Sequence, residues 1–421
     1  MLRGARDLDC ITPQREIPFE PHAVRAPPAL RVLYLTDSLS DLDGVGRYGM
    51  RLLAALEAAS PGLQVHVLLA RKHRPTSQQV PPHWKVEVAL PPDYFYYMSP
   101  LRYWVWRILG TWRTWRAARQ ADLVHAIKDY PHSHLALAGA RLAGKPCLAT
   151  AHGTYTIEPL LSVRHARRAR KVLAAFQQVI AVSRYTRGRL LQHMPGIDGF
   201  EERVHVIPNC VDAEHYREPR SLDLRPWSGK RFTLAIGEVK ERKGHHLALE
   251  AWCAVARDYP DLEHFVVGHL APEGDESGYS QHLLDLIQQQ GMTGRVHFLG
   301  NVTEDEKVDL LQQAEVFVHT PITAADGGFE GFGIVYLEAS AAGTPCLGTR
   351  ESGAEDAIVH ERTGLLCDPT AGAVQAALSR LLGDSSLREH LGEQGVQFAC
   401  ESSWDQNADQ VLGLYERALK S

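Results

Sequence analysis

The chain has 421 residues, of which 44% are hydrophobic and 23% are charged, so it is long enough for two domains with separate cores. Its net charge of −5 argues against the basic domain typical of nucleic-acid binding, and no nucleic-acid partner is expected. No uncharged apolar run reaches the roughly 18 residues that a membrane-spanning helix needs. The N-terminal segment lacks the apolar region of a secretory signal.

The seven cysteines are scattered, their number is odd, and no CxxC pair occurs. This pattern favours reduced, buried thiols, and we therefore expect a cytoplasmic protein. The histidines lack neighbouring cysteines or carboxylates at metal-ligand spacing. The sequence DLD at Asp41–Asp43 resembles a metal-binding DxD motif, but a three-residue match is weak evidence, and no metal site is expected.

The chain begins with a segment, residues 1–29, that holds five prolines and few periodic apolar positions. It is expected to form a disordered tail. The run LRVLYLTDS then predicts a buried parallel strand, and a glycine loop and an amphipathic helix follow it. Strand, glycine loop and helix open a Rossmann-like unit, and we expect such a domain over residues 30–209. Its further predicted strands are 63–70, 123–127, 146–153, 178–183 and 203–209.

A polar, proline-rich segment at 210–229 is interpreted as a linker. A second alternating series predicts another Rossmann-like domain over residues 230–400. Its predicted strands are 232–239, 262–270, 295–302, 315–321, 344–349 and 363–369. The expected fold class is α/β, with two doubly wound domains that face each other across a ligand-binding cleft. The last helix, within 401–421, is expected to pack back on the first domain.

One stretch of the second domain, DGGFEGFGIVYLEASAAGTPCLGT, holds two glutamates with seven residues between them. It follows a predicted strand and therefore begins at the cleft. Its helix is expected to start at Phe332 or Gly333 and to end at Gly343. Glu330 then lies just before the helix N-terminus, and Glu338 lies inside the helix.

The glycine-rich start of this helix offers backbone amides to an anion such as a diphosphate. Each carboxylate accepts hydrogen bonds from two hydroxyls at once, which suits a sugar diol. We therefore interpret the pair as contacts to a nucleotide sugar, with Glu330 on the hexose and Glu338 on the ribose. The structural alternative places Glu330 as a charge at the helix N-terminus and Glu338 on a solvent-exposed face.

The same stretch resembles the E-x7-E signature of glycosyltransferase family 4, the retaining transferases of the GT-B fold. The resemblance covers roughly residues 31–400, and it includes GVGRYGMRLLAAL, ATAHGTY, VIPNCVDAEHY, RVHFLGNVTEDEKVDLLQQAEVFVHTP and GTPCLGTRESGAEDAIVHERTGLLCDP. Within VIPNCVDAEHY, Cys210 stands where the family usually has a glycine. The resemblance implies that the second domain binds the donor and the first binds the acceptor.

The resemblance also implies roles for individual residues. Glu330 is implied to contact the transferred sugar and Glu338 to bind the ribose, while His152 lies beside the reacting sugar from the acceptor domain. Backbone amides are implied to line the sugar and the diphosphate at Phe332, Gly333 and Ile334. The loop that closes on the phosphates is implied to contain Gly44 and Gly46.

The family pattern also calls for a basic pair that neutralises the leaving diphosphate. The segment IGEVKERKGHHLALEAW matches the pattern at Lys243, but Glu238 stands where an arginine is common. We assign Lys243 as the leaving-group cation and Lys240 as its partner, with Arg242 nearby. The alternative for both lysines is an exposed basic turn.

The resemblance implies a metal-independent hexosyltransferase that retains the anomeric configuration. The donor is expected to be a UDP- or GDP-linked sugar, with no separate cofactor. A glycan or lipid-linked acceptor in envelope polysaccharide or glycolipid synthesis fits this interpretation. Two alternatives remain open: a nucleotide-sugar epimerase, and a non-catalytic sugar-nucleotide-binding partner of another transferase.

Aromatic residues and arginines alternate in the stretch 93–120, which includes Trp104, Trp106, Trp112 and Trp115. Aromatics and arginines on one helix suit a membrane interface, here the inner face of the plasma membrane. They also suit an acceptor groove, because rings stack on sugars and arginine binds phosphates. The structural alternative is an amphipathic helix whose arginines extend to solvent.

Overall fold

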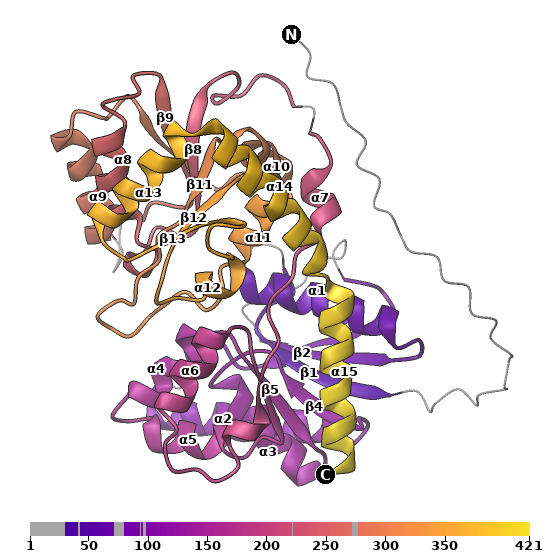
Figure 1. The fold of residues 1–421 in the computed structure, drawn as a ribbon. Coiled ribbons are helices and arrows are strands. Elements are labelled where there is room, and N and C mark those ends of the chain that lie inside the picture. Colours follow the sequence, from indigo (N-terminus) through magenta and orange to yellow (C-terminus); the bar gives the residue numbers. More distant parts are fainter. Residues whose placement is uncertain are drawn as a thin grey trace, which may run out of the picture.

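The computed structural model describes residues 30–40, 43–70, 80–92, 94–95, 98–220, 222–271 and 277–421. The predicted tail, 1–29, lies outside the described residues. Two α/β domains, each built on its own parallel sheet, lie one above the other in Figure 1. The predicted fold class, two doubly wound domains, is therefore confirmed.

The first sheet contains seven strands among the described residues, in the order β3-β2-β1-β4-β5-β6-β7, and all its pairs are parallel. The strands are β1 (Arg31–Thr36), β2 (Gln64–Ala70), β3 (Lys85–Leu90), β4 (Leu123–Ala126), β5 (Cys147–Ala151), β6 (Gln178–Ala181) and β7 (Val204–Val206). The helices are α1 (Gly44–Ala59), α2 (Pro100–Ala118), α3 (His132–Ala143), α4 (Thr154–Leu161), α5 (Ala166–Leu173), α6 (Arg184–Gln192) and α7 (Ala213–Arg217).

The second sheet contains six strands among the described residues, in the order β10-β9-β8-β11-β12-β13, again all parallel. The strands are β8 (Arg231–Ile236), β9 (Leu262–Val267), β10 (Val296–Gly300), β11 (Val316–Val318), β12 (Cys346–Thr349) and β13 (Gly364–Cys367). The helices are α8 (His245–Val255), α9 (Ser277–Gln289), α10 (Glu304–Gln313), α11 (Ile334–Ala341), α12 (Ala354–Ala357), α13 (Ala371–Gly383), α14 (Ser385–Glu401) and α15 (Trp404–Lys420).

Strand β3 is the one strand of the described residues that the sequence did not predict. Its sequence, KVEVAL, is short and half polar, and its first four residues are exposed or half-buried. It forms the edge of the first sheet and pairs only with β2. Edge strands bury little apolar surface, so the apolar run that marks the inner strands is absent here.

Each sheet is buried on both faces, as parallel sheets usually are. Along β1, Leu33 and Leu35 belong to one apolar cluster, and Val32 and Tyr34 belong to another. This alternation places the two clusters on opposite faces of the sheet. The second domain has a corresponding pair of clusters around β8 and β9.

The last helix, α15, packs on the first domain although it follows the second domain in the sequence. In Figure 1, α14 and α15 form the yellow helices that run from the upper domain to the lower. Buried Tyr415 contributes its hydroxyl to a hydrogen bond with Nδ1 of His125 at 2.7 Å, and Nε2 of His125 pairs with Oγ1 of Thr150 at 2.9 Å. The apolar side of α15 joins the cluster around β1, which ties the chain end to the first domain.

The segment 210–229 is more ordered than its polar composition suggests. It contains helix α7, and Tyr216 and Trp227 are buried in the apolar cluster of the second domain. The indole of Trp227 donates to Oδ2 of Asp309 at 2.7 Å. Two aromatic anchors therefore fix this connection to the second domain.

Three other sequence expectations concern the cysteines, membrane-spanning helices and metal ligands. Four of the six cysteines described are buried, and all six are free thiols. The described helices include none that is both long and apolar enough to cross a membrane. No group of three or more potential metal ligands occurs within the described parts of the chain.

Three buried histidines make the stability of this fold dependent on pH. Burial lowers the pKa of His125, His245 and His264 to about 3 each, whereas the unfolded chain protonates them near about 6.5. The unfolded state therefore binds more protons as the pH falls below about 6.5. We expect the free energy of unfolding to decrease by about 1.4 kcal/mol per pH unit for each histidine, and to be flat above that pH.

Urea unfolding between about pH 6.5 and about pH 5, where the carboxylates remain ionised, measures this slope. The variant His264→Asn keeps a polar atom near Oγ1 of Thr233, the partner of the His264 ring at 2.7 Å, and is expected to reduce the slope by one histidine's share. An unchanged slope in this variant would contradict the assignment of His264 as neutral in the fold.

Candidate functional site

The loop before α11 follows β11 and brings Glu330 and Gly333 to the side where the two domains meet. Gly333 precedes the helix with φ of 81°, a conformation that favours glycine. A Cβ at Gly333 would also lie 2.8 Å from the ring of Tyr336. The helix begins at Ile334 and ends at Ala341, within two residues of the predicted bounds.

Glu338 is the most deeply buried charge of this region, with 1% of its side chain exposed. Its Oε1 accepts from Arg47 at 2.5 Å, from the Tyr216 hydroxyl at 2.8 Å and from Lys307 at 3.2 Å. Arg47 comes from α1 of the first domain, so this cluster crosses from one domain to the other. The solvent-exposed alternative for Glu338 is thereby excluded.

The second oxygen of Glu338, Oε2, is buried and receives no hydrogen bond within the described part of the chain. Glu338 also lines a cavity of about 170 Å³ together with Arg47, Ile334 and Trp404. Burial raises the pKa of Glu338, but the charges of Lys307 and Arg47 outweigh it and lower the pKa below its ordinary value. The cavity thus holds an ionised carboxylate with one acceptor to spare, which suits a diol.

Glu330 lies in the loop between β11 and α11 and is also buried. Its Oε2 pairs with Nζ of Lys243, and Nε2 of His319 lies 3.4 Å from the same oxygen. Burial raises the pKa of Glu330, but Lys243, His319 and Arg242 together hold it well below the ordinary value. Glu330 is therefore ionised and fixed in place by a cation and a neutral imidazole.

The three cations of the basic segment near Glu330 have different partners. Lys243 pairs with Glu330, whereas Lys240 lies 3.4 Å from Oε2 of Glu238. Arg242 also reaches Glu238, at 3.5 Å, but its side chain packs against Gly328 of the loop before α11, and its charge acts on Glu330. Arg242 therefore acts on Glu330 while Lys240 pairs with Glu238, and the role given to Lys240 stays a prediction.

His152 lies at the end of β5, where its Nε2 donates to the carbonyl of Ile127 at 2.8 Å. This bond leaves Nδ1 as the acceptor of the ring. Burial lowers the pKa of His152, against the opposing charge of Asp129. The edge of the ring packs on Tyr48, with centroids 4.8 Å apart, so the histidine is neutral and its tautomer is fixed.

The loop before α11, called the Glu330 loop below, touches the first domain directly at glycine positions. A Cβ on Gly331 would lie 1.9 Å from the carbonyl oxygen of His152, and a Cβ on Gly153 would lie 2.8 Å from Cα of Gly331. Thr154 donates to the carbonyl of Phe329 at 2.7 Å and accepts from its amide at 2.9 Å. Only glycines permit this approach, which brings the segments of His152 and Glu330 together.

The remaining sequence-predicted residues are also placed. Gly44 and Gly46 form the first turn of α1 rather than a free loop, and Asp43 caps this turn by accepting from the Gly46 amide at 2.7 Å. A Cβ at Gly46 would lie 2.6 Å from the Ser40 carbonyl oxygen. Phe332 is buried. Asp43 thus has a structural role, while Asp41 lies outside the described residues.

Sequence reasoning missed four residues that the fold brings to the two glutamates. They are Arg47, Tyr216, Lys307 and His319. Arg47 sits inside the predicted glycine segment, GVGRYG, which could have drawn attention to it. Tyr216, Lys307 and His319 also lie in segments that resemble the family, but nothing in those segments shows that these side chains meet the two glutamates.

Two protein-family models match the sequence of this chain. A family model described as glycosyl transferases group 1 matches residues 223–398, and one described as Glycosyltransferase Family 4 matches residues 42–215. Together the two models span most of both domains.

Several characterised relatives are similar in sequence. A D-inositol 3-phosphate glycosyltransferase of Salinispora arenicola is 28% identical over 72% of this chain and 70% of its own length. A phosphatidyl-myo-inositol mannosyltransferase of Mycobacterium tuberculosis is 28% identical over 73% of this chain and 77% of its own. A D-inositol 3-phosphate glycosyltransferase of Corynebacterium urealyticum is 31% identical, and the match spans about half of its length.

Solved structures share the fold at low sequence identity. HepE of Anabaena, in complex with UDP and glucose, has a TM-score of 0.70 at 18% identity, and the match covers 92% of this chain and all of HepE. WaaG, a glycosyltransferase involved in lipopolysaccharide biosynthesis, has a TM-score of 0.67 at 17% identity, covering 90% of this chain and 98% of WaaG. With the two family models spanning both domains, the chain belongs to the glycosyltransferases of group 1 and family 4 and has the GT-B fold.

Proposed function

We propose that the chain transfers a hexose from a UDP-linked donor to an acceptor hydroxyl, with retention at the anomeric carbon and without a metal ion. The observation that carries this proposal is Glu338, an ionised carboxylate that lines a cavity and has one oxygen without a donor in the described structure. Such an oxygen fits the hydroxyls of a nucleoside ribose. The UDP in the related HepE structure supports a uridine donor.

The groups around Glu330 provide the chemistry for the leaving diphosphate. Lys243 and Arg242 supply positive charge, and the glycine-rich start of α11 supplies backbone amides. Fixed cations and amide dipoles stabilise the charge that develops as the glycosidic bond breaks. Glu330 accepts hydrogen bonds from hydroxyls of the transferred sugar, and Lys243 holds the Glu330 carboxylate in position.

The acceptor is expected to bind against the first domain, beside His152. Neutral His152 offers Nδ1 to a sugar hydroxyl, since Nε2 is committed to Ile127. The relatives named for inositol phosphate, phosphatidyl-myo-inositol and lipopolysaccharide support a glycan or lipid-linked acceptor. We place the protein in the cytoplasm, with a role in envelope polysaccharide or glycolipid synthesis.

The alternative of a non-catalytic partner rested on Glu238, whose charge would repel a diphosphate. The Glu238 side chain is 63% exposed and is paired with both Lys240 and Arg242. An exposed carboxylate that is paired with two cations contributes little net negative potential in the cleft, and so repels a diphosphate weakly. Catalysis is therefore favoured over the non-catalytic alternative.

The assignment of Glu338 to the ribose predicts that Glu338→Gln weakens UDP binding. A hydrogen bond to a charged group is worth about 1.5–3 kcal/mol, so the dissociation constant should rise roughly 10- to 100-fold. Isothermal titration calorimetry measures this change. Glu304→Gln is the matched control, because Glu304 contacts the same Tyr216 and Lys307 but is half-exposed. If both variants weakened UDP binding equally, Glu338 would have a structural role and would not bind the ribose.

The placement of Arg242 predicts a difference between two neighbouring cations. Arg242→Gln should lower kcat for sugar transfer roughly 100-fold, because it removes a fixed charge near the leaving group. Lys240→Gln should change kcat by less than about threefold, since Lys240 faces exposed Glu238. The opposite ranking in steady-state assays would restore Lys240 as the partner of Lys243.

The transferase proposal itself is tested by Glu330→Gln. We expect transfer to fall at least roughly 100-fold while UDP affinity changes by less than about threefold, because Glu330 contacts the sugar and not the nucleotide. Nucleotide release from UDP- and GDP-sugars, with and without lipid extract as acceptor, gives the rate. If the natural chain binds UDP and consumes none of these donors, the non-catalytic alternative is correct.

A further inference from the structure

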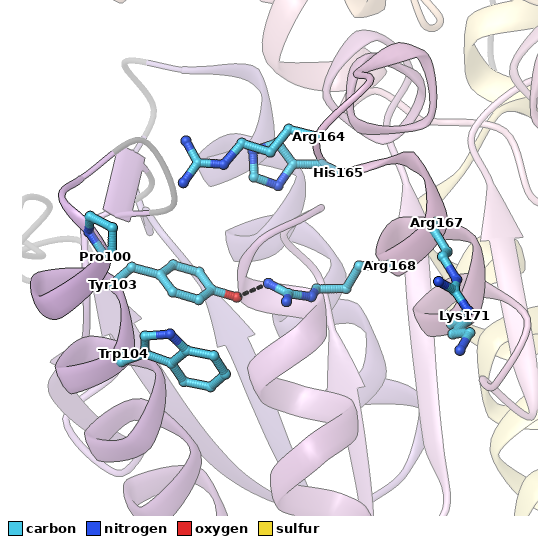
Figure 2. Close-up of a pocket in the computed structure, with 8 residues that line it drawn as sticks. All are labelled: Pro100, Tyr103, Trp104, Arg164, His165, Arg167, Arg168 and Lys171. Atoms are coloured by element: carbon cyan, nitrogen blue, oxygen red, sulfur yellow. Dashed lines mark hydrogen bonds between the residues drawn. The ribbon is translucent and has the colours of Figure 1, made fainter.

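A second cavity lies in the first domain, away from the donor site. It has a volume of about 440 Å³ and opens between α2 and the start of α5. Figure 2 shows Tyr103 and Trp104 on one wall and Arg164, Arg167, Arg168 and Lys171 around the other. None of its lining residues is acidic.

The four cations of this cavity have no acidic partner among the described residues. None of them lies within salt-bridge distance of a carboxylate among the described residues, and the contact that fixes one of them is a hydrogen bond from Arg168 to the Tyr103 hydroxyl. Elsewhere on this domain, Arg31, Arg184 and Arg187 each have a carboxylate within 3 Å. Unpaired cations that converge on a cavity suit an external anion.

Beside the cavity, α2 presents an apolar stripe to solvent. Its exposed large residues recur at helical spacing and are Leu101, Trp104, Val105, Ile108, Leu109 and Trp112. The opposite side of the helix packs on α3 through Gly110 and Thr114. Val163, which precedes α5, is also fully exposed. Trp104 belongs both to the cavity lining and to this stripe, so the basic cavity adjoins the exposed apolar side of α2.

A short series of contacts connects this cavity to the predicted acceptor site. The ring of His165, which lines the cavity, lies 6.0 Å from the ring of Tyr130. Tyr130 follows Asp129, whose Oδ1 accepts from the backbone amide of His152 at 3.4 Å. The cavity and His152 thus share one buried segment, residues 129–130.

We propose that this cavity binds the phosphate head group of an anionic membrane lipid, with the apolar stripe of α2 against the acyl region. A soluble phosphate ester satisfies the cations but leaves the stripe exposed, whereas a lipid satisfies both. An amphipathic helix with aromatic residues and adjacent Lys and Arg is the pattern of a protein that lies on an anionic bilayer. This inference deepens the proposed function, because it gives the lipid-linked acceptor a place to enter.

Co-sedimentation with vesicles tests this inference on the full chain. Vesicles of phosphatidylcholine alone are compared with vesicles that also contain phosphatidylinositol, at one fixed ionic strength. The variant Arg164→Gln/Lys171→Gln should bind the anionic vesicles roughly 30-fold more weakly than the natural chain. Arg217→Gln/Lys420→Gln removes the same charge far from the cavity and should change binding by less than about threefold.

Three results would overturn the proposal. They are equal binding by the two double variants, equal binding of the natural chain to neutral and anionic vesicles, and binding of glycerol phosphate to the cavity without any vesicle binding. The last result, read by isothermal titration calorimetry, would assign the cavity to a soluble phosphate ester.

Vesicle binding needs neither donor nor turnover, so it is independent of the transferase proposal. The variant Glu338→Gln should sediment with anionic vesicles as the natural chain does. Loss of vesicle binding in the cavity variant, together with normal UDP affinity, would support the lipid site alone. Normal vesicle binding by a chain that consumes no nucleotide sugar would refute the transferase proposal and leave the lipid site standing.

Discussion

The buried charge of Glu338 is the constraint on which the arrangement of the cleft depends. A carboxylate with 1% of its surface exposed is strongly destabilising unless cations and hydrogen-bond donors surround it. Here the donors come from three separate elements: Arg47 from α1, Tyr216 from α7 and Lys307 from α10. Because Arg47 belongs to the other domain, the charge that is proposed to bind the ribose also links the two domains.

The second link between the domains is steric and lies at the Glu330 loop. Gly331 and Gly153 approach so closely that any side chain at either position would collide with backbone. Around this contact, Thr154 bonds to both backbone groups of Phe329, and Arg184 pairs with Asp356 at 2.8 Å. The proposed catalytic groups therefore come from both domains, and their geometry depends on the angle at which the domains meet.

The two proposed binding regions differ in how their cations are paired. At the proposed donor site, Lys243 and Arg242 have carboxylate partners that hold them in place before any ligand arrives. At the cavity between α2 and α5, Arg164 and Lys171 have no carboxylate within salt-bridge distance among the described residues. Preorganised cations suit catalysis on a leaving diphosphate, and unpaired surface cations suit attraction to an anionic surface.

The sequence alone determined the fold class, the donor helix and the positions of Glu330 and Glu338, because apolar runs, glycines and the spacing of the two acids are local signals. It did not determine β3, a half-polar edge strand, or the partners of Glu338. Arg47 and Lys307 are far from Glu338 in the chain, so only packing brings them together. The same holds for the cavity, where α2 and α5 meet only in the tertiary structure. The periodicity of apolar residues along the chain determines the helices and strands. Packing between distant segments determines which charged side chains share a site.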